Sequence, residues 1–301
     1  MSHVVSAVIA TVGRPSVAVA VRSVLAQSAE VREVIVVLDA ATSVSLPSDD
    51  RVVLIHAPAG SGAARCRQLG IDAARGSVIA LLDDDDEWLP DKLECQLSKV
   101  RPEWGPGWVS SSRMAVVGPG DRRRTWPRRL IEPHESVADY LFRVREVGVG
   151  GAVLQTSTLV FPTALARQVR WDGHRGAVHD EPTWLIEVQR RVPDVRLLHV
   201  PEVLSVYDVR RSSVSRSSQD RTGDYIAWGL RHLVCESPRV RGDYLCSSPV
   251  SAAVSARSLP GVARAVWSAL AYGRPGPCAL TYAGLSAVRI VVGRLVSLIW
   301  S

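Results

Sequence analysis

Short apolar runs alternate with amphipathic segments over the first hundred residues, and this pattern predicts strands alternating with helices. Continuous apolar runs predict buried strands over residues 4–10, 33–38, 51–56 and 77–82. One helix is predicted from Pro15, a residue tolerated in a first helical turn, to about Gln27. A second is predicted from about Ser61 to Ala74, ended by Gly76. Strands that alternate with helices imply βαβ units, so we expect an α/β fold with a mostly parallel central sheet flanked by helices.

The pattern is less regular from about residue 103 and becomes helical from about residue 220. Residues 108–117 and 195–200 predict strands, and residues 183–191 predict a helix. The arginine-rich run 122–129 predicts a solvated basic loop, with contact to a phosphorylated acceptor or a membrane as the alternative.

Residues 279–300 predict a long apolar helix that contains Arg289 and Arg294. Three placements are open for this helix. It packs against the protein, lies on a membrane surface, or spans a membrane, and two arginines make the last placement costly.

Charge and cysteine usage narrow the classes of partner. The chain has 301 residues, a net charge of +6 and five scattered cysteines without a CxxC pair. A basic chain suits nucleic acid, an anionic membrane or a phosphorylated substrate, but no aromatic-basic interleaving typical of nucleic-acid modules occurs. The cysteines predict neither a disulfide framework nor a zinc site. No signal-peptide pattern opens the chain, so we expect a cytoplasmic protein, with contact to the inner face of the cell membrane left open.

Four consecutive aspartates, residues 83–86, directly follow the apolar run 77–82. Carboxylates so close together repel one another unless a cation lies among them. Mg²⁺ is commonly bound by one or two carboxylates together with substrate phosphates, and ligands of open α/β sheets bind beyond the carboxyl ends of strands. The run therefore predicts a seat for a metal and a diphosphate. The alternative is a solvated acidic loop before the helix that begins near Pro90.

Three other segments at predicted strand ends add candidate ligands. Gly13 allows a tight turn after the first strand, and Arg14 offers a diphosphate or base contact. Asp39 follows the second strand and either accepts hydrogen bonds from a base or ribose or caps a turn. The segment 60–65 opens a helix, whose free N–H groups favour anions. Its third glycine is replaced by Arg65 and it follows the third strand, which argues against a dinucleotide fold. Parallel strands would bring all these ends to one crevice.

Taken in order, these motifs resemble those of the family 2 glycosyltransferases, which have the GT-A fold. The matching segments are Thr11-Val12-Gly13-Arg14-Pro15, Val37-Leu38-Asp39, residues 60–70 and residues 82–90. The resemblance implies that Thr11, Gly13, Arg14, Asp39 and Arg65 contact the nucleotide-sugar. It also implies that Asp83 and Asp84 hold the ribose and diphosphate, and that Asp85, with Asp83, binds Mg²⁺ or Mn²⁺.

The resemblance continues more loosely into the second half. Inverting members use a carboxylate base at the start of a helix, and two registers of residues 179–185 place it at Asp180 or at Glu181. The alternative for both residues is a helix cap. Residues 155–159 resemble an acceptor-side strand. Arg210 stands where many members have a histidine, and is either a mobile diphosphate clamp or a surface residue.

The sequence therefore predicts a metal-dependent inverting glycosyltransferase (a hexosyltransferase type) that acts in polysaccharide or glycoconjugate assembly. We expect a UDP- or dTDP-sugar donor, a glycan or lipid-linked acceptor and no nucleic acid. Residues 1–218 would form the GT-A domain, with a nucleotide-binding half (1–102) and an acceptor half (103–218), and residues 219–301 a helical region, with contact to the membrane surface left open. Two alternatives are a non-catalytic nucleotide-sugar-binding or scaffold protein and a sugar-phosphate nucleotidyltransferase. The latter lacks its glycine-rich, lysine-containing signature here.

Overall fold

The computed structural model describes residues 3–148, 150–171, 173, 177–209 and 219–299, with the backbone alone for 294–299. The chain divides into two compact units. Unit 1 comprises Met1–Glu135 and Ala152–Arg211, and unit 2 comprises Ser136–Gly151 and Ser212–Ser301. The segment Ser136–Gly151 thus belongs with the C-terminal helices, whereas the sequence placed it in the α/β domain.

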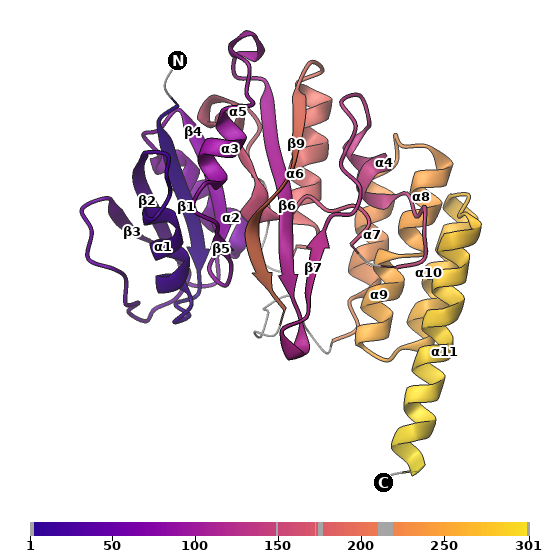
Figure 1. Cartoon of the computed structure of the whole chain (residues 1–301). Helices are drawn as coiled ribbons and strands as arrows, with labels where there is room; N and C mark the ends of the chain where they lie inside the picture. The colour runs from indigo at the N-terminus through magenta and orange to yellow at the C-terminus, as the bar shows by residue number, and fades with distance from the viewer. Residues whose placement is uncertain (1–2, 149, 172, 174–176, 210–218, 300–301) are drawn as a thin grey trace. The chain divides into compact units, whose positions relative to one another are not determined.

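The N-terminal part of unit 1 is the parallel βαβ array that the sequence predicts (Figure 1). Its strands lie in the order β3-β2-β1-β4, and neighbouring strands are parallel. The bounds of its elements are β1 (Val5–Thr11), α1 (Val17–Leu25), β2 (Val31–Leu38), β3 (Val52–His56), α2 (Ala63–Ala73) and β4 (Val78–Asp83). The carboxyl ends of these four strands consequently lie along one edge of the sheet.

Beyond β4 the sheet becomes mixed and continues through β8, β6, β9 and β5. β8 runs antiparallel to β4, while β6 and β9 are parallel to each other. The bounds are β5 (Glu87–Trp88), α3 (Lys92–Leu97), η1 (Pro102–Trp104), β6 (Trp108–Val117), η2 (Pro119–Asp121), β7 (Arg123–Trp126), η3 (Thr156–Thr158), β8 (Val160–Pro162), α5 (Thr163–Gln168), α6 (Asp180–Arg191) and β9 (Arg196–Asp208).

Two segments differ from their predicted structure. Within the basic run 122–129, β7 pairs antiparallel with β6, so the expected loop is partly an edge strand. The polar composition of β7 hid this pairing, since backbone hydrogen bonds to β6 form the strand. Within residues 155–159, η3 is a 3-10 turn, and the strand β8 begins only at Val160.

The apolar side chains of β1 alternate between the two faces of the sheet, and a helix covers each face. Val5, Ala7 and Ile9 lie in one buried cluster with the inward residues of α1, which are Val17, Ala20, Val21 and Val24. Val8 faces the other side, where a Cβ added at Gly70 of α2 would collide with it. This spacing of apolar residues, two along the strand and three or four along the helix, fixes α1 and α2 on opposite faces.

Unit 2 is helical. Its elements are α4 (Val137–Phe142), α7 (Thr222–His232), α8 (Pro238–Leu245), α9 (Ser248–Ser255), α10 (Leu259–Tyr272) and α11 (Pro277–Ile299). Asp243, fully buried in α8, accepts hydrogen bonds from the backbone N–H groups of Val144 and Gly276 and pairs with Arg239. One carboxylate therefore ties together three segments of this unit. Among the described residues, none of the helices has the length and apolar character needed to cross a membrane.

Candidate active site

The carboxyl ends of β1, β2 and β4 bring the predicted site residues together. In the register of the sheet, Thr11 lies beside Leu38, and Ala10 lies beside Asp83. Asp39 directly follows Leu38, and its backbone N–H donates a hydrogen bond to the Thr11 carbonyl over 2.8 Å. Residues far apart in sequence thus share one edge of the sheet, as parallel pairing predicts.

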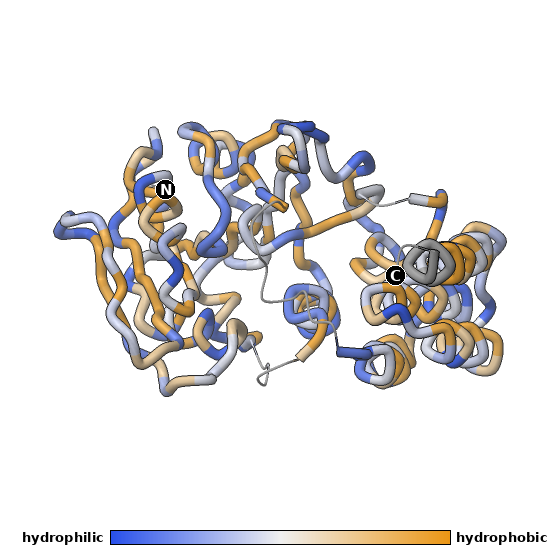
Figure 2. Tube along the Cα trace, turned by 90° about the horizontal axis from the view of Figure 1, so that it is seen from below, coloured by the Kyte–Doolittle hydropathy of each residue, from blue (hydrophilic) through white to orange (hydrophobic). Residues whose placement is uncertain are grey.

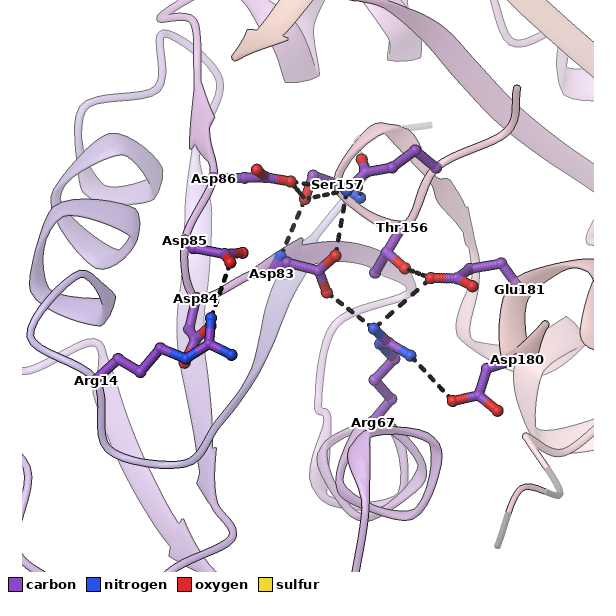
Figure 3. A network of polar contacts seen from close by, with 11 residues as sticks. Arg14, Arg67, Asp83, Asp84, Asp85, Asp86, Thr156, Ser157, Asp180 and Glu181 are labelled. Carbon is purple, nitrogen blue, oxygen red and sulfur yellow. Dashed lines mark hydrogen bonds and ion pairs between the residues drawn. The ribbon is translucent and has the colours of Figure 1, made fainter. Parts of the chain in front are cut away.

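Arg14 and Thr11 hold two of the four aspartates, and Figure 3 shows Arg14 beside Asp84 and Asp85. The Thr11 hydroxyl donates to Asp84 over 2.6 Å and accepts the Gly13 N–H over 3.0 Å. Arg14 donates to Asp84 over 3.3 Å and to Asp85 over 2.8 Å. The Asp85 side chain keeps 18% of its surface exposed, so it is the more accessible carboxylate of this pair.

Asp39 holds the glycine-containing loop before α2. Its two carboxylate oxygens accept the backbone N–H groups of Ser61 and Gly62, each over 2.8 Å. The alternative left open from the sequence was a cap of the turn that directly follows Asp39, whereas these two hydrogen bonds cap a loop that is distant in sequence. Carboxylate oxygens carry further lone pairs, so the cap leaves acceptor capacity for a ligand at this strand end.

Arg67 is the central cation of the site, and the sequence analysis did not single it out. Its guanidinium donates to Asp83 over 2.8 Å and lies 3.7 Å from Glu181 and 3.9 Å from Asp180 (Figure 3). The guanidinium carbon lies 5.5 Å from the ring centroid of Trp171. Only 7% of the Arg67 side chain is exposed. Arg67 therefore links the aspartate run to Asp180 and Glu181, the two candidates for the general base.

Arg65, in contrast, lies on the exposed face of α2 and makes no hydrogen bond or ion pair with a site carboxylate among the described residues. Two residues along a helix turn the side chain by about 200°, so Arg65 and Arg67 face opposite ways. The expected lining of the crevice by Arg65 is thus replaced by Arg67. The inward positions of α2, which include Cys66, Arg67 and Gln68, are buried. The sequence signal for Arg67 was its helical spacing from the apolar residues Ala64 and Ile71, which places all three on one face of α2.

The turn η3 supplies a second set of groups that the sequence described only as an acceptor-side strand. Gln155 donates to Asp83 over 3.2 Å and to Asp86 over 2.7 Å. The Ser157 hydroxyl donates to Asp86 over 2.6 Å and accepts the Asp83 N–H over 3.0 Å. Asp86 is buried, and these hydrogen bonds to Gln155 and Ser157 fix the turn that carries Asp83 to Asp85.

The two candidate bases stand at the first turn of α6. Glu181 accepts a hydrogen bond from the Thr156 hydroxyl. Its other oxygen, Oε2, makes no hydrogen bond or ion pair within the described part of the chain. The side chains of Asp180 and Glu181 are 20% and 24% exposed. A helix N-terminus favours negative charge, so this position suits carboxylates that stay accessible.

Aromatic packing fixes the start of α6 against the rest of unit 1. Trp184 stacks on Trp171 with ring centroids 4.9 Å apart, and its Nε1–H donates to the Val169 carbonyl over 2.7 Å. Trp184 is 2% exposed. Because Trp171 also lies under Arg67, the same stack supports both the cation and the helix that presents the carboxylates.

Burial dominates the electrostatics of the aspartates. Burial raises the pKa of Asp83 to about 6, although Arg67 opposes the rise. It raises the pKa of Asp84, opposed by the Thr11 hydrogen bond and Arg14. It raises the pKa of Asp86 well above the ordinary range, with the charge of Asp83 adding to the effect. Burial disfavours the charged form of Arg67, but Asp83, Glu181 and Asp180 outweigh it and raise the pKa. The pKa of each of these three aspartates rises because burial disfavours the charged form more strongly than the arginines and hydrogen bonds favour it.

The donor set fits a cation that arrives with a diphosphate. No group of three or more His, Cys, Asp or Glu side chains in the described residues is arranged to hold a metal ion. Mg²⁺ usually needs only one or two carboxylates, completed by waters and phosphate oxygens. Asp83 and Asp85 could supply those carboxylates, both being partly exposed. Arg210, the predicted clamp, lies outside the described residues.

Comparison with solved structures defines the class of fold. Fragment 1-349 of S. aureus TarS superposes with a TM-score of 0.62 at 12% identity, covering 95% of this chain and 88% of that one. The same fragment in complex with UDP-GlcNAc gives a TM-score of 0.56 at 12% identity, covering 95% of this chain and 89% of that one. At this identity the likeness shows the fold alone, which is the GT-A type that the sequence predicted.

Comparison of sequences defines the family. Residues 6–145 match the family model described as "Glycosyl transferase family 2". The amylovoran biosynthesis glycosyltransferase AmsB of Erwinia amylovora is 36% identical over 116 residues, which are 38% of this chain and 36% of AmsB. The glucosyltransferase WfgD of Escherichia coli is 42% identical over 53 residues, 18% of this chain and 21% of WfgD. Residues 6–145, just under half of this chain, thus form a glycosyl transferase family 2 domain, which confirms the resemblance. The matches span about a third or less of these relatives.

Proposed function

We propose that this protein transfers a sugar from a nucleoside diphosphate to an acceptor hydroxyl with inversion at the sugar carbon. One observation carries the proposal: Arg67 joins Asp83, at the strand end, to Glu181 and Asp180, at the start of α6. A single displacement needs a binding site for the leaving group on one side of the reacting sugar carbon. It needs a general base for the acceptor hydroxyl on the other side. The family 2 domain supports sugar transfer as the reaction.

The strand-end residues would bind the donor. Asp39 would face the nucleobase of the donor, with Thr11, Gly13 and Arg14 beside it. Asp83 and Asp84 would hold the ribose and diphosphate. The described contacts pre-organise these groups, because Thr11 and Arg14 already fix Asp84 and Asp39 already fixes the loop before α2. TarS was solved with UDP-GlcNAc, which favours a UDP-sugar among the candidate donors.

Asp85, with Asp83, would hold Mg²⁺ or Mn²⁺. When bound, such an ion supplies positive charge that stabilises the diphosphate as it leaves. Arg14 contacts Asp85 and has 23% of its side chain exposed, so it keeps Asp85 oriented toward the same edge. Arg210 remains a proposed further cation for the diphosphate.

Asp180 and Glu181 are the two candidates for the general base of the reaction. One of them would take the proton of the acceptor hydroxyl as its oxygen forms the new bond to the sugar carbon and the bond to the diphosphate breaks. A single displacement of this kind inverts the sugar carbon. Thr156 and Arg67 orient Glu181 through one oxygen and leave Oε2 for the acceptor. Asp180 stays the alternative base, since it lies at a similar distance from Arg67.

The acceptor is proposed from the relatives. AmsB is named for amylovoran biosynthesis, and the name of WfgD includes a diphosphoundecaprenol-linked acceptor. A glycan or lipid-linked acceptor in polysaccharide assembly therefore fits this chain best.

Thermal unfolding in the presence of UDP, dTDP and GDP, each with and without Mn²⁺, tests the donor site. A ligand that binds only the folded state raises its melting temperature. We expect a metal-dependent shift for one nucleotide that disappears in Asp85→Asn, while the matched variant Asp91→Asn, an exposed residue after the run, keeps it. No shift with any nucleotide would favour a non-catalytic scaffold.

Turnover of the bound donor separates the two candidate bases. We expect the true base, replaced as Glu181→Gln or Asp180→Asn, to lose about 10²–10⁴-fold in rate, the usual contribution of general-base catalysis. Nucleotide affinity should persist in both variants. Full activity in both would refute the assignment of the base to this pair.

A further inference from the structure

Helix α11 is apolar on two opposite faces. Its inward face carries the buried residues Ala279, Ala283, Ser286 and Ile290, of which Ala283 and Ile290 pack in one cluster with residues of α9 and α10. Its outward face carries exposed residues that are also apolar, namely Leu280, Leu285, Val288, Val291 and Val292. Leu285 and Val288 are 56% and 58% exposed. A helix that is hydrophobic all round normally has both faces covered, so the outward face calls for a partner.

The neighbouring helix α10 adds aromatic residues to this unit's exposed apolar surface. Trp267 and Leu270 are 64% and 62% exposed, and Tyr272 packs edge-to-face against Trp267 with centroids 6.1 Å apart. Figure 2 shows orange, hydrophobic residues along the helices of this unit. Tryptophan and tyrosine are enriched where a protein meets the membrane–water interface, because their rings are apolar at one end and polar at the other.

Helices α10 and α11 themselves carry only positive charge. Residues 244–301 contain five arginines and neither Asp nor Glu. Arg274 and Arg289 are exposed, and Arg264, also exposed, pairs with Asp220 over 3.3 Å. Basic residues near an anionic lipid surface are attracted to it, so the exposed residues of α10 and α11 are complementary to anionic lipid in both apolar character and charge.

We infer that the outward residues of α10 and α11 dock on an anionic lipid bilayer, with the apolar side chains entering the interface and the arginines at the headgroups. A second copy of the chain fits less well. A two-fold interface places the same surface against itself, and the arginines of both copies would meet without a carboxylate from residues 244–301. The inference does not depend on the proposed transferase activity.

Vesicle flotation of the full chain tests the inference. The probes are vesicles of phosphatidylcholine alone and of phosphatidylcholine mixed with phosphatidylglycerol. We expect binding to the mixed vesicles that weakens as salt is added. The triple variant Trp267→Gln, Leu285→Gln and Val288→Gln should bind these vesicles at least about tenfold more weakly, because each substitution removes apolar area that would be buried in the bilayer interface. The matched control replaces three exposed apolar residues elsewhere, Val53, Leu54 and Val234, by glutamine and should bind like the wild type.

Arginine variants distinguish docking on anionic lipid from non-specific hydrophobic adsorption. Arg274→Gln with Arg289→Gln should weaken binding to the mixed vesicles by about fivefold per arginine, the effect of about 1 kcal/mol for each basic residue at an anionic surface. Arg22→Gln with Arg101→Gln, two exposed arginines of unit 1, should not. All variants change exposed side chains, and their circular dichroism and nucleotide binding should match the wild type.

Three results would overturn the inference. The first is no flotation with the mixed vesicles. The second is equal loss of binding in the control variants. The third is a wild-type dimer in light scattering that the triple variant turns into a monomer, which would assign the surface to a second copy.

Discussion

Replacing Arg67 by methionine should destabilise unit 1 more than any exposed ion pair can. Methionine keeps most of the side-chain volume but removes the guanidinium that Asp83, Glu181 and Asp180 share. The Arg67 side chain is only 7% exposed, so water cannot readily replace the lost charge. The variant leaves three neighbouring carboxylates without their common cation.

The magnitude follows from this burial. Removing one partner of a buried ion pair typically costs about 3–5 kcal/mol of unfolding free energy, mostly because the remaining charge stays buried. A second change should recover part of that loss. Asp83→Asn in the Arg67→Met background removes the carboxylate that is bound at 2.8 Å and leaves an amide. We therefore expect the double variant to be more stable than Arg67→Met alone.

Urea unfolding followed by tryptophan fluorescence measures these differences. The control is Arg170→Met, which breaks an exposed pair with Asp72, with Arg170 at 44% side-chain exposure. Exposed pairs contribute about 0–1 kcal/mol. An unfolding free energy of Arg67→Met that is no lower than that of Arg170→Met would refute this prediction, as would a further loss of stability when Asp83→Asn is added to Arg67→Met.

Two more predictions concern packing and pH. Gly70→Ala should cost about 1–3 kcal/mol through overpacking, because its new Cβ would collide with Val8, whereas Gly284→Ala, with open space around it, should be neutral or stabilising; thermal unfolding compares them. Burial lowers the pKa of His199 to about 4 from 6.5. The unfolded state then binds the proton first, so stability should fall as pH drops from 6.5 toward 4, by about 2 kcal/mol at pH 5. His199→Gln should lack this part of the pH dependence in urea titrations at pH 7 and pH 5, and an unchanged slope would contradict the burial argument.

Several features of the fold were predictable because local periodicity encodes them. The apolar runs gave β1 to β4 within one or two residues of their observed bounds. Parallel pairing of those strands then required Thr11, Asp39 and the aspartate run to meet at one edge, and they do. The helical C-terminal region was predicted on the same basis. The change from a parallel to a mixed sheet was not, since antiparallel pairing of β8 with β4 joins residues about 80 positions apart and leaves no local pattern.

The sequence by itself determined the first four strands, β1 to β4, where they end, and that acidic and basic groups gather beyond those ends. Spacing of two along strands and of three or four along helices suffices for this, because it depends only on neighbours in the chain. The tertiary structure alone decided which of those groups meet. It turned Arg67 inward in place of Arg65, brought Thr156 to Glu181, and joined Ser136–Gly151 to the C-terminal helices. These contacts depend on which helix face packs against the sheet and on pairs distant in sequence, which no short stretch of residues can specify.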